Sequence, residues 1–217
     1  MFKNHFKTAF RSIQKRKGFA LINIIGLSLG IWCTILISIW IFDEFDKDNF
    51  HVKGNRISQV LTRVSSMEDA DNTWDGTGYP VAEALAAQIP EIETAVRITS
   101  TRGSNLQLDE KSRKIQIRGA DSDFFNLFSF VLKETLDEKS EPYRITGIFE
   151  KIPRQSTIKF DALVPLDNFL PMNNKSWGNT WVQTYVLQAE NSDLDLLGQK
   201  VRKIPEKMGD DKWRTLV

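Results

Sequence analysis

The sequence predicts an α+β fold, in which an N-terminal amphipathic helix and a single transmembrane helix precede a mixed α+β extracytoplasmic domain. Residues 19–42 contain no charged side chain, and every Lys and Arg of residues 1–42 precedes this run. The rest of the chain mixes segments of strand-like alternation with segments of helical periodicity, without a strict βαβ order. We therefore expect a cytoplasmic basic helix (1–18), a transmembrane helix (19–42) and an extracytoplasmic domain (43–217).

The amino-terminal helix is predicted from two parallel repeats. Phe2, Phe6, Phe10 and Ile13 recur every three or four residues, beside a basic series. This pattern is typical of a helix that lies among lipid headgroups. The alternative is a solvated basic tail that only sets the orientation of the chain. The residues that we expect at the membrane surface, with lipid as their partner, are Lys3, Lys7, Arg11, Lys15, Arg16 and Lys17.

The uncharged run from Phe19 to Phe42 is long enough to cross a bilayer, because 24 helical residues rise about 36 Å against about 30 Å of hydrocarbon. A buried core helix and a cleaved signal peptide are the alternatives. The run is longer than a signal-peptide core, and no small-x-small cleavage site ends it before Asp43. Basic residues precede it and acidic residues follow it, which predicts a cytoplasmic N-terminus.

Gly26 and Gly30 form a GxxxG pair inside this run. Glycine at that spacing allows another helix to approach closely, although such pairs are common by chance. We expect these two residues to pack against other transmembrane helices.

Composition limits the function of the remaining residues. The chain has 217 residues, of which 41% are hydrophobic and 26% are charged, as in globular proteins. Residues 1–42 hold six basic and no acidic side chains, so the remainder has a net charge of −5. A nucleic-acid-binding domain presents a basic face, so we expect no nucleic-acid partner. The single cysteine, Cys33, excludes an intramolecular disulfide.

The elements expected after the membrane helix alternate between strands and short helices. Residues 106–108 and 115–117 should form a hairpin around Asp109–Ser112, and Asp121 or Ser122 should cap a helix through Phe124, Phe125 and Phe128. Ser192 should cap a helix with apolar residues from Leu194 to Met208, which Pro205 should break or kink near Ile204. The other expected elements are strands at Ile57–Val64, Ala95–Thr99, Tyr143–Phe149, Ile158–Val164 and Trp181–Leu187, and a helix at Pro80–Ile89.

No constellation of residues indicates catalysis, a metal or a cofactor. His5 and His51 are the only histidines, and the predicted membrane separates them. The acidic run before His51 fails as a calcium loop, because Phe50 and Ile57 stand where oxygen ligands are needed. Gly76–Gly78 lacks the remainder of a phosphate-binding loop. Trp177 and Trp181 could form a stacking surface, but packing in a core explains them better. We expect a non-enzymatic protein without cofactor or metal.

The order of five sequence blocks resembles the N-terminal part of MacB/FtsX-type ABC transporter permeases. The blocks are FKNHFKTAFRSIQKRKGFALINIIGLSLGI, DEFDKDNFHVKGNRISQV, GYPVAEALAAQIPEIETAVRI, IRGADSDFFNLFSF and YRITGIFEKIPRQSTIKFDALV. The resemblance implies a MacB-like periplasmic core domain after the first transmembrane helix, held at the bacterial inner membrane. It also implies a cytoplasmic ABC ATPase and other permease helices as partners, a periplasmic protein or peptide as cargo, and mechanical rather than covalent action.

Two departures from this family pattern alter the expectation. Only residues 131–142 separate Phe130 from the segment that starts at Tyr143, which predicts the loss of part of the second lobe. No second apolar span follows, which predicts a truncated permease. The alternative function is a single-pass extracytoplasmic sensor or binding module, and a membrane-tethered enzyme is a third.

Overall fold

The computed structural model describes residues 5, 11, 15–64, 73–108, 111–134, 138–139, 144–169, 176–207 and 213–216. Contacts divide the chain into two units, residues 1–47 and 48–217, and we describe each by itself.

The first unit is dominated by one helix, α2 (Lys17–Phe45). Its 29 residues carry no charge between Lys17 and Asp43 and are apolar on all sides there, and none of them is buried. The expected transmembrane helix at 19–42 is therefore observed as a helix, slightly longer at both ends. The helix begins after Arg16, whose φ of −120° lies outside the helical range. The predicted amphipathic helix lies mostly outside the described residues.

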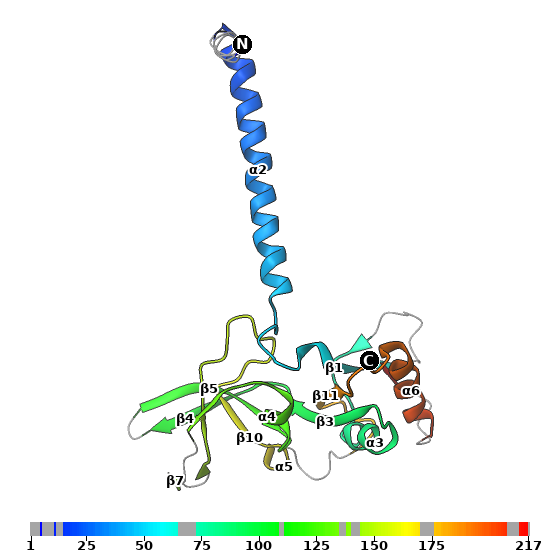
Figure 1. Cartoon of the computed structure of the whole chain (residues 1–217). Coiled ribbons are helices and arrows are strands. Elements are labelled where there is room, and N and C mark those ends of the chain that lie inside the picture. The colour runs from blue at the N-terminus through cyan, green and yellow to red at the C-terminus, as the bar shows by residue number, and fades with distance from the viewer. Residues whose placement is uncertain are drawn as a thin grey trace. The chain divides into compact units, whose positions relative to one another are not determined.

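The second unit is an α+β domain, as predicted (Figure 1). Its central sheet has the strand order β10-β5-β3-β11-β1-β12, with β2 beside β1 and β4 beside β5. All pairs are antiparallel except β10 and β5. The larger elements are β1 (Ile57–Val64), α3 (Val81–Gln88), β3 (Ile92–Thr99), β4 (Arg102–Leu108), β5 (Lys111–Ala120), β10 (Ala162–Pro165), β11 (Val182–Gln188), α6 (Leu194–Lys207) and β12 (Trp213–Leu216).

Shorter elements complete the domain. Two small two-stranded sheets pair β6 with β9 and β7 with β8. The short elements are η1 (Gly54–Arg56), β2 (Thr73–Trp74), α4 (Phe124–Leu127), β6 (Leu132–Glu134), β7 (Glu138–Lys139), β8 (Arg144–Ile145), β9 (Ile148–Phe149) and α5 (Leu166–Phe169).

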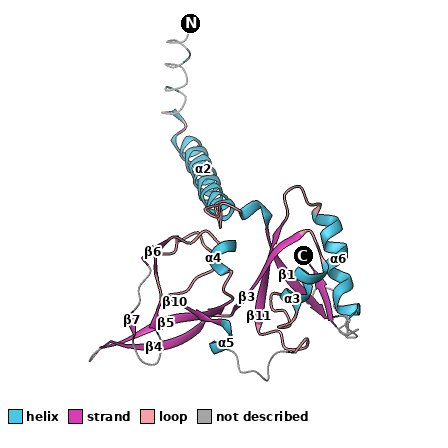
Figure 2. Cartoon of the chain, turned by 60° about the horizontal axis from the view of Figure 1, so that its bottom comes forward, coloured by secondary structure: helices cyan, strands magenta, loops and turns pink. Residues whose placement is uncertain are grey.

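The core lies on both faces of the central sheet, because successive strand residues point to opposite faces. Val186 of β11 packs with apolar residues of α3 and α6, whereas its neighbour Leu187 packs in an aromatic cluster around α4. Figure 2 shows α3 and α6 next to β1 and β11, and α4 at a different part of the sheet. The helix-covered core contains Val60, Val81, Leu85, Ile89, Leu197, Val201 and Ile204.

The aromatic cluster fills the other face. Phe124 is 1% exposed and stacks on Phe130 with 5.5 Å between ring centroids. Phe160 meets both rings edge-on. The remaining aromatic members are Phe50, His51, Phe125, Phe128, Phe149 and Tyr185.

Several predicted elements are confirmed. β1 has the predicted bounds, α3 starts immediately after Pro80, and β11 is shifted by one residue from the prediction. The hairpin of β4 and β5 pairs Leu108 with Lys111. β3 is three residues longer than expected.

Two predicted strands are wrong. Tyr143 lies outside the described residues, and residues 144–149 form two short strands rather than one, because the chain changes partner between β8 and β9. Residues 158–164 form a strand only from Ala162 onward. Ile158 and Phe160 produce strand-like alternation, but they lie in a loop whose apolar side chains enter the aromatic cluster.

Predicted helix ends also needed correction. Neither Asp121 nor Ser122 caps α4, because the Asp121 carboxylate accepts bonds from Arg97. Asp193, not Ser192, caps α6, since its Oδ1 accepts bonds from the N–H groups of Asp195 and Leu196 at 2.9 and 3.3 Å. α6 continues past Pro205, and Leu194 is 54% exposed rather than part of the buried stripe.

Candidate functional site

The apolar surface of α2 is the first feature with functional meaning. The helix is long and apolar enough to cross a membrane, and its span is entirely unburied. Two hydroxyl groups are satisfied within the helix itself, since Thr34 Oγ1 donates to Gly30 O and Ser38 Oγ donates to Thr34 O, each at 2.8 Å. Because these hydroxyl groups already have hydrogen-bond partners, they can lie in hydrocarbon, which offers none.

Gly26 and Gly30 lie on open surface of this helix. A methyl group added at either position would have no described atom within 4 Å. Space for a close helix neighbour therefore exists, and the predicted packing role stays a prediction.

The predicted membrane-surface cations are only partly described. Arg11, Lys15, Arg16 and Lys17 are exposed, whereas Lys3 and Lys7 lie outside the described residues. Their contact with lipid stays a prediction.

Residues 48–56 begin the second unit and are bonded to distant parts of it, and we call them the exit segment. Asp48 has a φ of 55°, a left-handed conformation that aspartate tolerates better than most residues. Its N–H donates to Gln155 O at 3.2 Å. Its carboxylate accepts bonds from the Thr157 N–H, at 2.9 Å, and from the Thr157 hydroxyl. The first residue of the domain is thus held by a loop more than 100 residues away.

His51 anchors the middle of the exit segment. Only 6% of it is exposed, and its ring lies 4.0 Å from Phe50 and 5.2 Å from both Phe128 and Phe130, between centroids. Nδ1 accepts a bond from the Ser129 N–H at 3.0 Å, so the neutral ring carries its proton on Nε2. Burial lowers the pKa of His51, and nearby Asp48 opposes that shift. Nε2 has no acceptor among the described residues.

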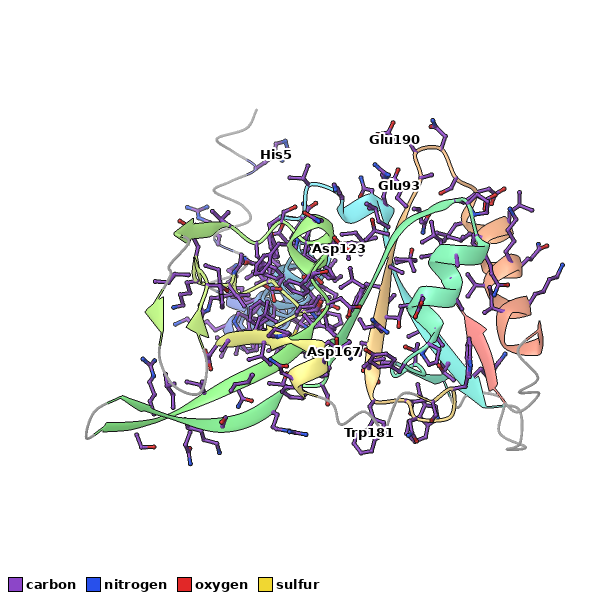
Figure 3. The ribbon with its side chains drawn as sticks, turned by 90° about the horizontal axis from the view of Figure 1, so that it is seen from below. His5, Glu93, Asp123, Asp167, Trp181 and Glu190 are labelled. Atoms are coloured by element: carbon purple, nitrogen blue, oxygen red, sulfur yellow. The ribbon has the colours of Figure 1, made fainter. Side chains whose placement is uncertain are left out.

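The end of the exit segment is held by two cations. Lys53 Nζ donates to Asn126 O at 2.9 Å. Arg56 Nε donates to Gln188 O at 2.7 Å, and its guanidinium also pairs with Glu93 and Glu190. Figure 3 shows Glu93 and Glu190 at the same end of the sheet. The exit segment therefore contacts both the α4 region and the ends of two central strands.

Inside the domain, Arg97 and Asp121 form a partly buried ion pair with two hydrogen bonds. Two guanidinium nitrogens bind the carboxylate at 2.8 and 3.0 Å, and a third donates to Tyr79 O. Burial alone would lower the pKa of Arg97, but the bonds to Asp121 outweigh burial and raise it. This pair joins β3 to the start of α4 and is structural.

The sequence motifs considered for chemistry have structural explanations here. Side chains at Gly76 and Gly78 would clash with the backbone of Thr180 and Trp177, so these glycines permit close chain packing. Trp177 packs against the helix-covered core, whereas Trp181 is 58% exposed. Among the described residues, no group of three or more His, Cys, Asp and Glu side chains could hold a metal ion.

Sequence reasoning missed the exit segment as a site. It recognised residues 43–60 as a block of the family pattern, used Asp48 only as one of the acidic residues that set the orientation, and gave His51 no structural role. The partners Ser129 and Thr157 lie 78 and 109 positions away, so spacing could not reveal them.

Comparisons with known proteins agree with this architecture. Residues 20–141 match the MacB-like periplasmic core domain family. A domain of a protein classed as a permease, from Porphyromonas gingivalis, has 18% identity and a TM-score of 0.63, covering 76% of this chain and 89% of that one.

Two further structures share the fold. The extracellular domain of the noncanonic ABC-type transporter YknZ from Gram-positive bacteria has 10% identity and a TM-score of 0.51, covering 74% and 100% of the two chains. The periplasmic region of MacB from Actinobacillus actinomycetemcomitans has 12% identity and a TM-score of 0.50, covering 73% and 87%. No curated protein matches the chain.

An unburied apolar helix followed by this α+β domain defines a membrane-anchored protein related to ABC transporter permeases. The chain belongs to the MacB-like periplasmic core domain family, which matches more than half of its length. Proteins of this family are transporter components and not, in general, enzymes.

Proposed function

We propose that the protein is a permease component whose domain moves with its membrane helix. In this proposal residues 1–18 lie at the cytoplasmic surface of the bacterial inner membrane, residues 19–42 cross it, and residues 43–217 lie outside. The chain acts mechanically, without catalysis or a cofactor, and its second lobe is abbreviated after Phe130.

The observation that carries the proposal is the set of bonds in the exit segment. A flexible linker would absorb a displacement of the helix. Only Asp46 and Lys47 lie in sequence between the end of α2 and Asp48, and Asp48 makes three bonds to residues 155–157. His51 and Arg56 continue that attachment into the aromatic cluster and the sheet. A two-residue connection that leads to a firmly bonded Asp48 supports the proposed transfer of a helix displacement to the domain.

The proposed partners follow from the surfaces of the first unit. Gly26 and Gly30 would face other permease helices, because small residues allow close packing in lipid. Lys3, Lys7, Arg11, Lys15, Arg16 and Lys17 would bind anionic headgroups at the cytoplasmic leaflet. A cytoplasmic ABC ATPase would drive the helices, and a periplasmic protein or peptide would be the cargo.

The test is ATPase coupling in lipid nanodiscs, using the full chain and the ABC ATPase encoded beside it. Asp48→Gly removes the carboxylate bonds while keeping a residue that accepts a positive φ. Asn191→Gly is the matched control, because Asn191 also has a positive φ, of 64°, but lies outside the exit segment. Stimulation of the ATPase should fall several-fold with Asp48→Gly and persist with Asn191→Gly.

Two outcomes would contradict the proposal. If the full chain neither co-purifies with the ATPase nor changes its rate, the resemblance is limited to the fold. If Asp48→Gly couples as well as the parent chain, the exit segment does not transmit motion. A Gly26→Ile/Gly30→Ile double variant should separately weaken co-purification with partner helices.

A further inference from the structure

The hairpin formed by β4 and β5 has one edge that no other described strand pairs with. β5 is paired by β10 along residues 117–120, and β3 meets it at Ala120. β4 pairs only with β5 in the described part of the chain. Figure 2 shows β4 as the outer strand of this hairpin. Arg102, Gly103, Asn105 and Leu106 are all exposed.

The hydrogen-bond partners of Gln116 on β5 show which backbone N–H and C=O groups of β4 point away from β5. The Gln116 N–H donates to Asp161 Oδ2 at 2.8 Å, and Gln116 O accepts from the Asp161 N–H at 2.7 Å. Both groups therefore point away from β4, which makes Gly103 and Gln116 a non-hydrogen-bonded pair. Antiparallel pairs alternate, so the N–H and C=O groups of Gly103, Asn105 and Gln107 point to the free edge.

The two edges of the hairpin differ in protection. Asp161 satisfies the outer backbone of β5 at Gln116, and β10 covers the residues that follow. β4 carries no proline or lysine and has no bulge in its register with β5, which are devices that usually protect an edge strand. Its row of donors and acceptors can therefore accept another strand.

Charge determines what kind of strand would fit. Residues 102–120 hold five basic and two acidic side chains, on a domain that is otherwise acidic. Leu106 pairs across the ladder with Arg113, and Asn105 pairs with Lys114. Arg113 and Lys114 are exposed, and the described ion pairs include neither. A strand added beside β4 would lie about 10 Å from β5, so long acidic side chains on it can approach these cations across β4.

We propose that the edge of β4 from Gly103 to Gln107 binds an extended acidic segment of a partner protein by strand addition. Backbone bonds to Gly103, Asn105 and Gln107 hold the segment. Arg113 shares a face with Leu106, and Lys114 lies on the opposite face. An alternating segment therefore directs its acidic side chains toward Lys114 and its apolar ones over Leu106. The exposed Trp181 immediately precedes β11, whose first residue Val182 pairs with Thr99, three positions before β4 begins.

A second copy of the chain is a poorer occupant. Pairing β4 with itself would bring two basic hairpins together, and like charges across a short distance oppose association. The inference concerns the domain alone and does not depend on the proposed mechanical role.

The test is fluorescence anisotropy with the full chain in detergent and a labelled seven-residue peptide of alternating glutamate and valine. The control probes are a lysine–valine peptide and a glutamate–valine peptide with N-methylated backbone amides. We expect binding of the first peptide only, weakening as salt rises because salt screens exposed charges.

Variants separate backbone pairing from charge. Asn105→Pro removes an outward N–H and leaves the bonds to β5 intact, so affinity should fall at least about tenfold. Asn105→Thr keeps that N–H and should bind within about twofold of the parent chain. Arg113→Gln/Lys114→Gln should lose about fivefold and most of the salt dependence. If Asn105→Pro lowers the melting temperature, Gln107→Pro replaces it.

Equal binding by the parent and the folded proline variant would overturn the proposal, as would equal binding of the lysine–valine peptide. Self-association of the parent chain that Asn105→Pro abolishes would also overturn it, because the edge would then serve a second copy.

Discussion

The two units of the chain use similar apolar side chains in opposite ways. Phe19 in α2 is 68% exposed, whereas Phe124 in the domain is 1% exposed. The domain buries its apolar residues on the two faces of a sheet and covers itself with charge. α2 has apolar side chains on every side and no buried residue.

This difference indicates the environment, bilayer or water, in which each unit is stable. A helix that is apolar all round is either buried in protein or placed in a bilayer. The described residues bury none of α2, so the bilayer is the environment that satisfies it. The domain needs no such environment, because its apolar area is removed from water by its own packing. Three substitutions or conditions sharpen this comparison.

The largest effect should come from a matched pair of phenylalanine truncations. Phe124→Ala should lower the unfolding free energy of the domain by about 3–5 kcal/mol, because it leaves a cavity among stacked rings. Phe19→Ala should leave domain stability unchanged, since its side chain contacts no core. Chemical denaturation of the full chain in detergent, followed by tryptophan fluorescence, measures both. Equal effects of the two truncations would refute the contrast.

A smaller effect should appear as the pH falls. The pKa of His51 is lowered by burial in the folded domain, so the unfolded state, with a pKa near 6.5, binds the proton more readily. The stability contributed by neutral His51 is therefore complete above pH 6.5 and is lost as pH falls toward the folded pKa. The slope should not exceed about 1.4 kcal/mol per pH unit.

The control for this pH dependence is His51→Asn, which keeps an acceptor for the Ser129 N–H but cannot titrate. Denaturation between pH 7.5 and 5.5 (roughly the window in which histidine titrates) should show the slope in the parent chain only. An identical slope in the variant would assign the effect to other groups.

The smallest effect concerns the cap of α6. Asp193→Ala should cost about 1 kcal/mol, because two N–H groups at the helix start lose their acceptor. Ser192→Ala should cost less, since the Ser192 hydroxyl bonds to Gln188 rather than to the helix. Thermal melts of both variants rank the two residues. A greater loss of melting temperature with Ser192→Ala than with Asp193→Ala would instead identify Ser192 as the helix cap, as the sequence predicted.

Local patterns were sufficient for much of the fold. α2 follows from an uninterrupted apolar run, and β1, α3 and the β4–β5 hairpin follow from periodicity and turn residues. Each of these signals lies within the segment that it predicts. The order of the sequence blocks similarly indicates the family, because each block is a run of neighbouring residues.

Features that depend on distant residues were not predictable in this way. Asp121 looks like a helix cap, but Arg97 takes its carboxylate from 24 positions away. The exit segment joins Asp48 to Thr157 and His51 to Ser129, and no local pattern encodes those contacts. The free edge of β4 likewise depends on which strand of the hairpin the distant β10 covers.

The most direct test of the account is the topology of the chain in cells. In a Cys33→Ser background, single cysteines replace His5 and Glu190, both exposed residues of different units. A membrane-impermeant maleimide is applied to intact spheroplasts and to lysed ones. The account predicts labelling of the Glu190 position in intact spheroplasts and of the His5 position only after lysis. Labelling of the Glu190 position only after lysis would place the domain in the cytoplasm and contradict the account.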